Sequence, residues 1–161
     1  MKSIGVLSII FLLAVSCSAV SRDLRQAAEP EVSFRQLAEN PSGYAGRIVV
    51  LGGYIIDTRN SDDQTELTVL QSPLRYTDQP QDSRYSEGRF IVTHNGKLNP
   101  SVFSRNRSIT VAGVVMADET RPLPIIESRE IHLWRRYDYP YYYQPEWYYH
   151  HPLRHIPPYQ W

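Results

Sequence analysis

The stretch from Arg47 to Asp57, RIVVLGGYIID, decides the fold of this chain. Its first half is β-branched and apolar at consecutive positions, which predicts a strand that is covered on both faces. Gly52 and Gly53 lie in the middle of the strand. Paired glycines inside a strand are typical of a bulge or a sharp bend, such as the corner of a small barrel. The stretch therefore predicts a strongly bent strand.

Further strands follow this one along the chain. Residues 65–70 alternate between apolar and polar, which places Leu67 and Val69 on one face. The polar turn at 60–63 comes directly before them, so they are predicted to form a hairpin with the first strand. A long polar loop is expected over 71–87. Three more runs are predicted as strands: RFIVTH at 89–94, SITVAGVVM at 108–116 and IIESREIHLW at 125–134.

A short helix is expected before the first strand, over Val32–Asn40. Ser33 is a suitable N-cap, Phe34 and Leu37 share one face, and Pro41 ends the helix. One helix and five bent strands predict a mainly β domain over 32–136: a small five-stranded OB-like barrel with a short N-terminal helix. A β-sandwich is the alternative.

The N-terminus indicates export from the cytoplasm. Lys2 precedes an apolar run from Ile4 to Val15, which has the length of a signal-peptide core. The run is shorter than the roughly 20 apolar residues that a membrane-spanning helix needs. We therefore interpret residues 1–16 as a removable signal peptide.

The single cysteine, Cys17, follows this run directly. Three interpretations are open: an ordinary residue near a cleavage site, half of an intermolecular disulfide, or a lipid attachment site. The sequence Leu13–Cys17, LAVSC, resembles a bacterial lipobox, although Ala14 stands where leucine is more usual. The lipidated cysteine is the preferred interpretation, and two or three acyl chains would anchor the protein stably.

The polar residues that follow predict a lipidated linker over 17–31. By resemblance to bacterial lipoproteins, Ser18 instead of aspartate implies the outer membrane rather than retention at the inner membrane. The domain is then expected to be lipid-anchored, on the periplasmic face rather than the cell surface.

The composition changes sharply at Tyr137. Residues 137–161 hold eight of the twelve tyrosines and five prolines, so a regular helix or central strand is excluded. This tail is expected either to pack on the barrel or to face outward as a platform for glycan, peptide or membrane interface. The candidates for ligand binding are its clustered aromatic residues: Tyr141, Tyr142, Tyr143, Trp147, Tyr148 and Tyr149.

The tail also contains His150, His151 and His155. Histidines close together can bind Zn²⁺ or Cu²⁺, but Pro152 prevents His151 and His155 from sharing a helix face. A structural site also needs four ligands in fixed geometry. No metal site is therefore assigned to these histidines.

Four stretches together resemble the Slp family of bacterial outer-membrane lipoproteins. They are the lipobox ending in Cys17, PSGYAGRIVVLGGYII at 41–56, SITVAGVV at 108–115, and IIESREIHLWRR at 125–136 with the aromatic tail behind it. The resemblance implies a lipidated envelope protein associated with stationary phase and stress. It supplies no catalytic residues.

The sequence contains no nucleophile elbow, zinc-protease helix or phosphate-binding glycine loop, so no enzyme activity and no cofactor are expected. A net charge of zero argues against a nucleic-acid partner. The expected function is a structural or stress-related, non-catalytic role in the envelope, with the membrane as partner and an envelope glycan or protein as a further candidate partner. The alternative is a periplasmic ligand-binding module for an oligosaccharide or a peptide.

Overall fold

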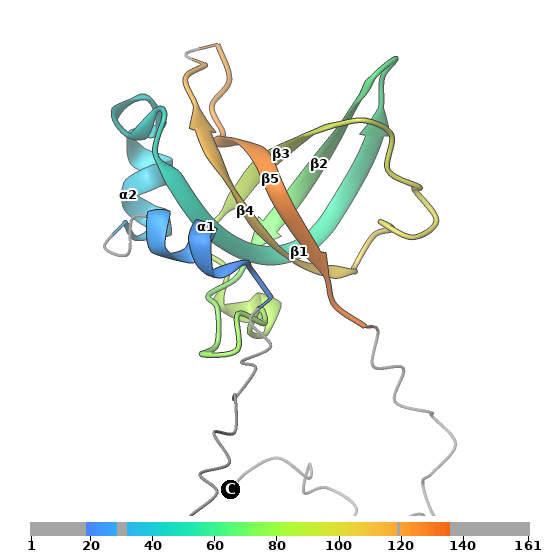
Figure 1. The fold of residues 1–161 in the computed structure, drawn as a ribbon, viewed down its shortest axis with the longest axis horizontal. Helices are drawn as coiled ribbons and strands as arrows, with labels where there is room; N and C mark the ends of the chain where they lie inside the picture. The colour runs from blue at the N-terminus through green and yellow to red at the C-terminus, as the bar shows by residue number, and fades with distance from the viewer. Residues whose placement is uncertain (1–18, 29–31, 119, 136–161) are drawn as a thin grey trace, which may run out of the picture.

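The computed structural model describes residues 19–28, 32–118 and 120–135 (Figure 1). The elements in chain order are α1 Arg22–Ala27, α2 Phe34–Glu39, the 3₁₀ helix η1 Pro41–Tyr44, β1 Ile48–Asn60, β2 Gln64–Gln71, the 3₁₀ helix η2 Ser83–Tyr85, β3 Arg89–Asn95, β4 Ser108–Met116 and β5 Ile125–Leu133. All five predicted strands are present, and β1 extends beyond its predicted end to Asn60.

The strands close into a barrel in the order β1-β2-β3-β5-β4. Neighbouring strands are antiparallel except β3 and β5, which pair in parallel through Ile91–Thr93 and Ile125–Glu127. The closed barrel confirms the predicted OB-like architecture over the alternative sandwich. Closure pairs every strand on both sides, so no long free edge is left.

The bend of β1 explains how one strand serves two partners. Residues 48–54 pair with β4, whereas residues 53–60 pair with β2. The register shift lies between Ile55 and Asp57, just after the glycine pair. At Gly53 a Cβ would collide with the carbonyl oxygen of Leu70, because the backbone of the paired strand β2 lies too close for any side chain at this position. The glycines thus permit close backbone approach, while the bulge itself falls beyond them.

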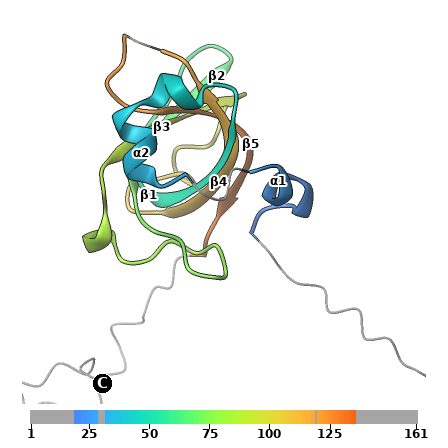
Figure 2. The same cartoon turned by 90° about the vertical axis from the view of Figure 1, so that its left-hand side faces the viewer.

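Helix α2 covers one end of the barrel, as Figure 2 shows. Ser33 forms the capping box: its hydroxyl accepts from the Gln36 amide at 3.3 Å, and the Gln36 side chain accepts from the Ser33 amide at 3.0 Å. Phe34 and Leu37 are buried against the barrel core, and the ring of Phe34 lies 6.1 Å from that of Phe90. The predicted helix and its apolar face are confirmed.

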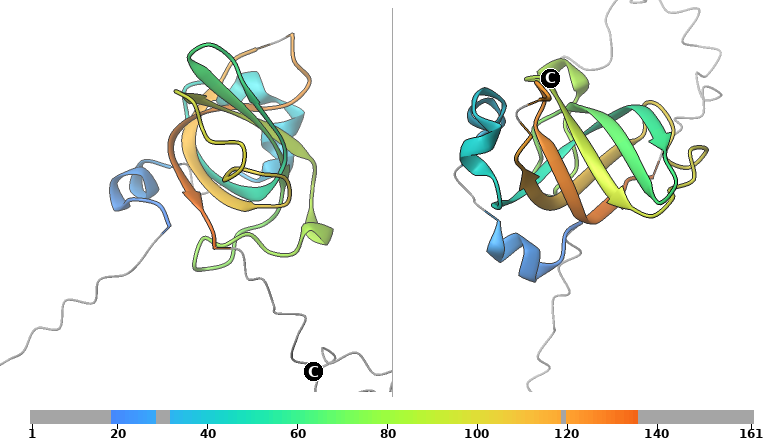
Figure 3. Two further views of the ribbon diagram at one scale, coloured as in Figure 1. Left: turned by 90° about the vertical axis from the view of Figure 1, so that its right-hand side faces the viewer. Right: turned by 90° about the horizontal axis from the view of Figure 1, so that it is seen from above.

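The opposite end of the barrel is crossed by the loop between β3 and β4 (Figure 3, left). Leu98 and Phe103 of this loop pack against the core as partly buried side chains. Loop and barrel wall are also joined by Thr58, whose hydroxyl donates to the Phe103 carbonyl at 2.6 Å. The apolar interior is therefore filled from both ends.

The predicted linker over 17–31 needs correction within residues 19–28. This segment contains helix α1, and its Ala19 and Val20 are buried, at 6% and 1% exposure. Ala28 forms a parallel bridge with Ile48 at the start of β1. The mostly polar composition of the segment led to the prediction of a linker. Two buried apolar side chains at its start, Ala19 and Val20, are enough for the segment to pack against the barrel.

Candidate functional site

A chain of polar contacts joins α1 to the end of β5. The guanidinium of Arg25 forms an ion pair with the carboxylate of Asp78, whose side chain is only 9% exposed. The hydroxyl of buried Thr110 on β4 donates to the Asp78 carbonyl oxygen at 2.6 Å. The indole N–H of Trp134 donates to the same hydroxyl oxygen at 2.9 Å. Three segments that are far apart in sequence therefore meet at Thr110.

Asp78 can take this position because of the turn around it. Its φ of 66° lies in the left-handed region, which aspartate tolerates better than most residues. The Asp78 amide donates to the Arg75 carbonyl at 2.9 Å, and the Arg75 amide donates to the Gln79 carbonyl at 2.8 Å. The turn directs the Asp78 carboxylate to α1 and leaves neighbouring Tyr76 fully in solvent, at 99% exposure.

A second contact holds the start of the described chain on β5. The backbone amide of Ser21 donates to the Glu130 carboxylate at 2.9 Å. Together with the burial of Val20, this contact fixes the polypeptide from residue 19 onward. None of these contacts was foreseen from the sequence, because Glu130 lies 109 residues from Ser21 and Asp78 lies 53 residues from Arg25, and no local pattern signals such pairs.

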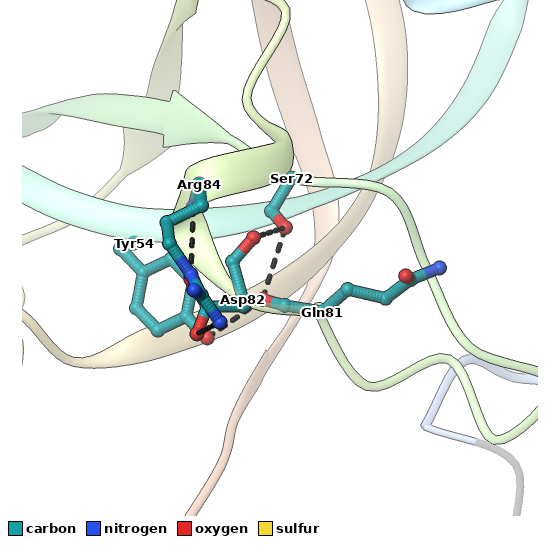
Figure 4. A network of polar contacts seen from close by, with 5 residues as sticks. All are labelled: Tyr54, Ser72, Gln81, Asp82 and Arg84. Atoms are coloured by element: carbon teal, nitrogen blue, oxygen red, sulfur yellow. Dashed lines mark hydrogen bonds and ion pairs between the residues drawn. The ribbon is translucent and has the colours of Figure 1, made fainter. Parts of the chain in front are cut away.

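The predicted long polar loop over 71–87 is held by a compact network, shown in Figure 4. Tyr54 of β1 donates its phenol proton to the Gln81 carbonyl at 2.7 Å, and the Ser72 hydroxyl contacts the Gln81 and Asp82 carbonyls at 3.0 and 3.1 Å. Burial, followed by the charge of Asp82, raises the pKa of the Tyr54 phenol above its usual value. Tyr54 therefore stays protonated and serves as a donor that fixes the loop.

Asp82 caps η2 at the end of this network. Its carboxylate accepts from the Arg84 amide at 2.9 Å and from the Arg84 side chain at 3.1 Å. These two hydrogen bonds hold the pKa of Asp82 below its ordinary value. Both side chains are exposed, so the pair orders the loop and provides no enclosed site for chemistry.

A shallow hollow of about 280 Å³ lies on the barrel wall at the connection between β4 and β5. Arg121 donates to the Glu66 carboxylate at 2.6 Å, and this hydrogen bond raises the pKa of Arg121. Asp118 accepts from the Thr120 hydroxyl and amide, which lowers the pKa of Asp118. The hollow is lined by Gln64, Glu66, Thr93, Met116, Ala117, Asp118, Arg121 and Ile125. Its charged groups are paired with one another in this state.

The strand histidines are held by local contacts. His94 Nδ1 lies 3.0 Å from the Ser128 hydroxyl, and the ring of His132 meets that of Trp134 edge to face at 4.5 Å. Within residues 19–28, 32–118 and 120–135, no group of three His, Cys, Asp or Glu side chains is arranged to hold a metal ion. Over the same ranges, no helix has the length and apolarity to cross a membrane.

The site residues that the sequence proposed lie outside the described residues. This applies to Cys17, to the histidines of the tail and to the aromatic candidates Tyr141, Tyr142, Tyr143, Trp147, Tyr148 and Tyr149. The structure instead brings together Arg25, Asp78, Thr110 and Trp134. Of these four, Thr110 and Trp134 belong to stretches that the sequence had singled out, SITVAGVVM and IIESREIHLW, although neither residue was proposed as a site residue.

Two curated proteins are similar in sequence to this chain. The outer membrane protein Slp of Escherichia coli (strain K12) is 28% identical over 120 residues, covering 73% of this chain and 63% of that protein. An uncharacterized protein of Haemophilus influenzae is 28% identical over 135 residues, covering 77% of this chain and 73% of that protein. The chain thus spans less than two thirds of the length of the Escherichia coli relative.

Among solved structures, an OBody bound to hen egg-white lysozyme is similar with a TM-score of 0.44 at 16% identity, covering 67% of this chain and 97% of that chain. This similarity says nothing of what the present chain binds.

A family model matches nearly the whole sequence. The match runs over residues 14–161 and therefore includes Cys17, the barrel and the aromatic tail. The order of motifs that suggested the resemblance is thus supported by an independent comparison. The chain belongs to the outer membrane lipoprotein Slp family.

Proposed function

We propose that this protein is lipidated at Cys17 and held by its acyl chains at the periplasmic face of the outer membrane, where its barrel has a structural, stress-related and non-catalytic role. The observation that carries the proposal is the lipobox-like stretch Leu13–Cys17, directly after an apolar run of signal-peptide length. Two or three acyl chains give stable anchoring, whereas one gives only reversible attachment.

The described part of the chain is consistent with a non-catalytic role. Its polar side chains with shifted pKa values are used to order loops: Tyr54 and Asp82 hold the loop over 72–88, and Asp118 and Arg121 hold the connection between β4 and β5. An enzyme site needs a nucleophile, base or acid facing an accessible cleft. His132 packs against Trp134, and neither His94 nor Ser128, which lie 3.0 Å apart, lines the hollow around Arg121.

The anchor is tested by mass spectrometry of the mature protein from its native membrane and by labelling with radioactive palmitate. We expect an N-terminal Cys17 that carries acyl groups, and label in the wild-type protein only. Cys17→Ser is expected to carry no label, and the same variant without residues 1–16 is expected to leave the membrane fraction. A mature wild-type protein with an intact leader peptide, or without fatty acid, would contradict the proposal.

A second candidate function is ligand binding on the barrel wall. The hollow around Arg121 lies on β2, β3 and the connection between β4 and β5, and oligosaccharides and oligonucleotides bind to this part of many OB folds. This step is an analogy of fold. An acidic sugar or peptide carboxylate would compete with Glu66 for the Arg121 guanidinium, because arginine binds carboxylates in a bidentate geometry.

Chemical shifts in NMR spectra test this candidate, with acidic oligosaccharides and acidic peptides added to the soluble Cys17→Ser protein. Binding is expected to shift the amides of Glu66, Thr93 and Arg121, and Arg121→Ala is expected to abolish the shifts. Arg129→Ala is the matched control, since Arg129 is an exposed arginine on neighbouring β5 that pairs with Glu127. Spectra unchanged by either ligand class would contradict the candidate.

The tail provides another proposed contact with envelope glycans. Its clustered aromatic residues, Tyr141, Tyr142, Tyr143, Trp147, Tyr148 and Tyr149, offer apolar faces on which sugar rings can stack. Replacing all six by alanine is expected to reduce retention on isolated envelope glycan. Equal retention of the wild-type and substituted proteins would contradict a stacking role.

A further inference from the structure

One side of the barrel carries the start of the described chain, the loop over 72–88 and the end of β5. All three lie at the lower end of the molecule in Figure 1, in Figure 2 and in the left view of Figure 3, which share one vertical axis. The ion pair between Arg25 and Asp78 joins the first two of these segments directly. We call this side the anchor face, defined as residues 19–21, 72–88 and 133–135.

The distance from the anchor face to Cys17 is limited by covalent geometry. The chain is held on the barrel from Ala19 onward, through buried Val20 and the Ser21–Glu130 hydrogen bond of 2.9 Å. Only Ser18 separates Ala19 from Cys17. Because each residue spans at most about 3.6 Å, the Cα of Cys17 lies within about 7 Å of the Cα of Ala19. The linker over residues 17–31 that the sequence predicted would allow the barrel to lie much farther from Cys17.

The anchor face also has side chains that suit a bilayer surface. Tyr76 is 99% exposed and Tyr85 is 59% exposed, and both belong to the loop over 72–88. Exposed Arg75 lies beside Tyr76 in sequence, whereas Arg84, beside Tyr85, is paired with Asp82. Tyrosine is enriched at the level of lipid headgroups, so the two exposed tyrosines are the side chains of this face that suit a bilayer surface. The tip of the β1–β2 hairpin, at the opposite end, instead carries the exposed carboxylates of Asp62 and Asp63.

From this placement we infer that the anchor face lies against the bilayer that holds the acyl chains of Cys17, with Tyr76 at the level of the headgroups. The inference rests on the lipidation proposed above. The short connection keeps the anchor face next to the membrane, so the β1–β2 hairpin at the opposite end points away from it. The surface left for partners is then the hairpin tip and the barrel wall rather than the loop over 72–88.

Fluorescent labels at single introduced cysteines test the orientation. Acylation blocks Cys17, the only native cysteine, so Tyr76→Cys and Asp62→Cys each provide one reactive thiol. Each lipidated full-length protein is labelled with an environment-sensitive dye and reconstituted into vesicles of phosphatidylethanolamine and phosphatidylglycerol. We expect a blue shift and loss of iodide quenching at position 76, and water-like emission at position 62. Equal emission and quenching at the two positions would overturn the inference.

Three controls separate the possible causes of protection, or of its absence, at position 76. Mass spectrometry of the same samples reports acylation: absence of fatty acid overturns both the proposed function and the orientation, whereas acylated protein with equal labels overturns the orientation alone. Tyr76→Cys in the soluble Cys17→Ser background is expected to remain accessible to iodide. Protection there, without lipid, would mean that the tail or a second copy covers the face, and would overturn the inference.

The third control lengthens the connection. Ten Gly/Ser residues inserted between Ser18 and Ala19 leave both the acylated cysteine and the docked segment intact, and they add about 17 Å of flexible reach. The blue shift at position 76 is expected to decrease. An unchanged shift would show that the short connection does not set the orientation.

Discussion

The carboxylate of Asp78 forms an ion pair with the guanidinium of Arg25, while the carbonyl oxygen of Asp78 accepts a hydrogen bond from the Thr110 hydroxyl. One residue of a surface loop thus binds both the N-terminal helix and the barrel wall. The loop over 72–88 and the segment over 19–28 consequently depend on each other for their positions.

Removing the cation of this pair should loosen the N-terminal segment. In Arg25→Ala the Asp78 carboxylate loses the Arg25 guanidinium at a position where its side chain is only 9% exposed. We expect a loss of about 1–2 kcal/mol in the free energy of unfolding, less than for a fully buried pair because Arg25 itself is partly exposed. Urea unfolding of the soluble Cys17→Ser protein measures it. Arg22→Ala, in an exposed position on the same helix, should change the stability little, and an equal loss in the two variants would contradict the role of the pair.

The hydroxyl of Thr110 should be coupled energetically to the indole of Trp134. Thr110→Val leaves the Asp78 carbonyl and the Trp134 N–H without this partner, and is expected to cost about 1–3 kcal/mol. Trp134→Phe removes one hydrogen bond and is expected to cost about 1 kcal/mol. A double-mutant cycle by urea unfolding should give a combined loss below the sum of the two, because the variants share a contact. Strict additivity would show that the contact contributes nothing.

Gly53 is expected to be intolerant of any side chain. In Gly53→Ala the added Cβ meets the Leu70 carbonyl oxygen of the paired strand, so the two strands must separate. We expect a loss of about 1–3 kcal/mol, as for other overpacked sites, measured by thermal unfolding. Gly43→Ala is the comparison, because its Cβ meets only the side chain of Asn40. A Gly53→Ala protein as stable as Gly43→Ala would contradict the close approach.

The carboxyl group of Asp82 should titrate below its ordinary pKa of 3.8 because it accepts hydrogen bonds from the Arg84 amide and side chain. A depressed pKa in the folded protein favours folding above the ordinary value, and this contribution disappears as the pH falls through the folded value. NMR titration of the carboxyl carbon measures the midpoint. Arg84→Ala should move the midpoint upward, because the hydrogen bond from the Arg84 side chain is lost while the one from the backbone amide of residue 84 remains. A midpoint at or above 3.8 in the wild-type protein would be the contrary result.

The sequence by itself determined the elements of the domain, whereas the closed structure decided for the barrel and against the sandwich. The alternation around Leu67 and Val69, the glycine pair of β1 and the capping residue Ser33 are local signals, and each one appears in the structure as the element it predicts. Local signals suffice here because strand period and helix capping depend on neighbouring residues. The family also followed from the sequence, since the order of its motifs is a property of the chain alone.

Only the tertiary structure decided that residues 19–28 pack on the barrel instead of forming a linker. Their composition is that of a linker, but Val20 is buried, Ser21 meets Glu130 and Arg25 meets Asp78. These contacts join residues that are 53 to 109 positions apart. Such pairs depend on the closed barrel, because it places β5 and the loop over 72–88 beside the N-terminal segment. The sequence marks Cys17 as the expected anchor, whereas the fold brings one face of the barrel next to it.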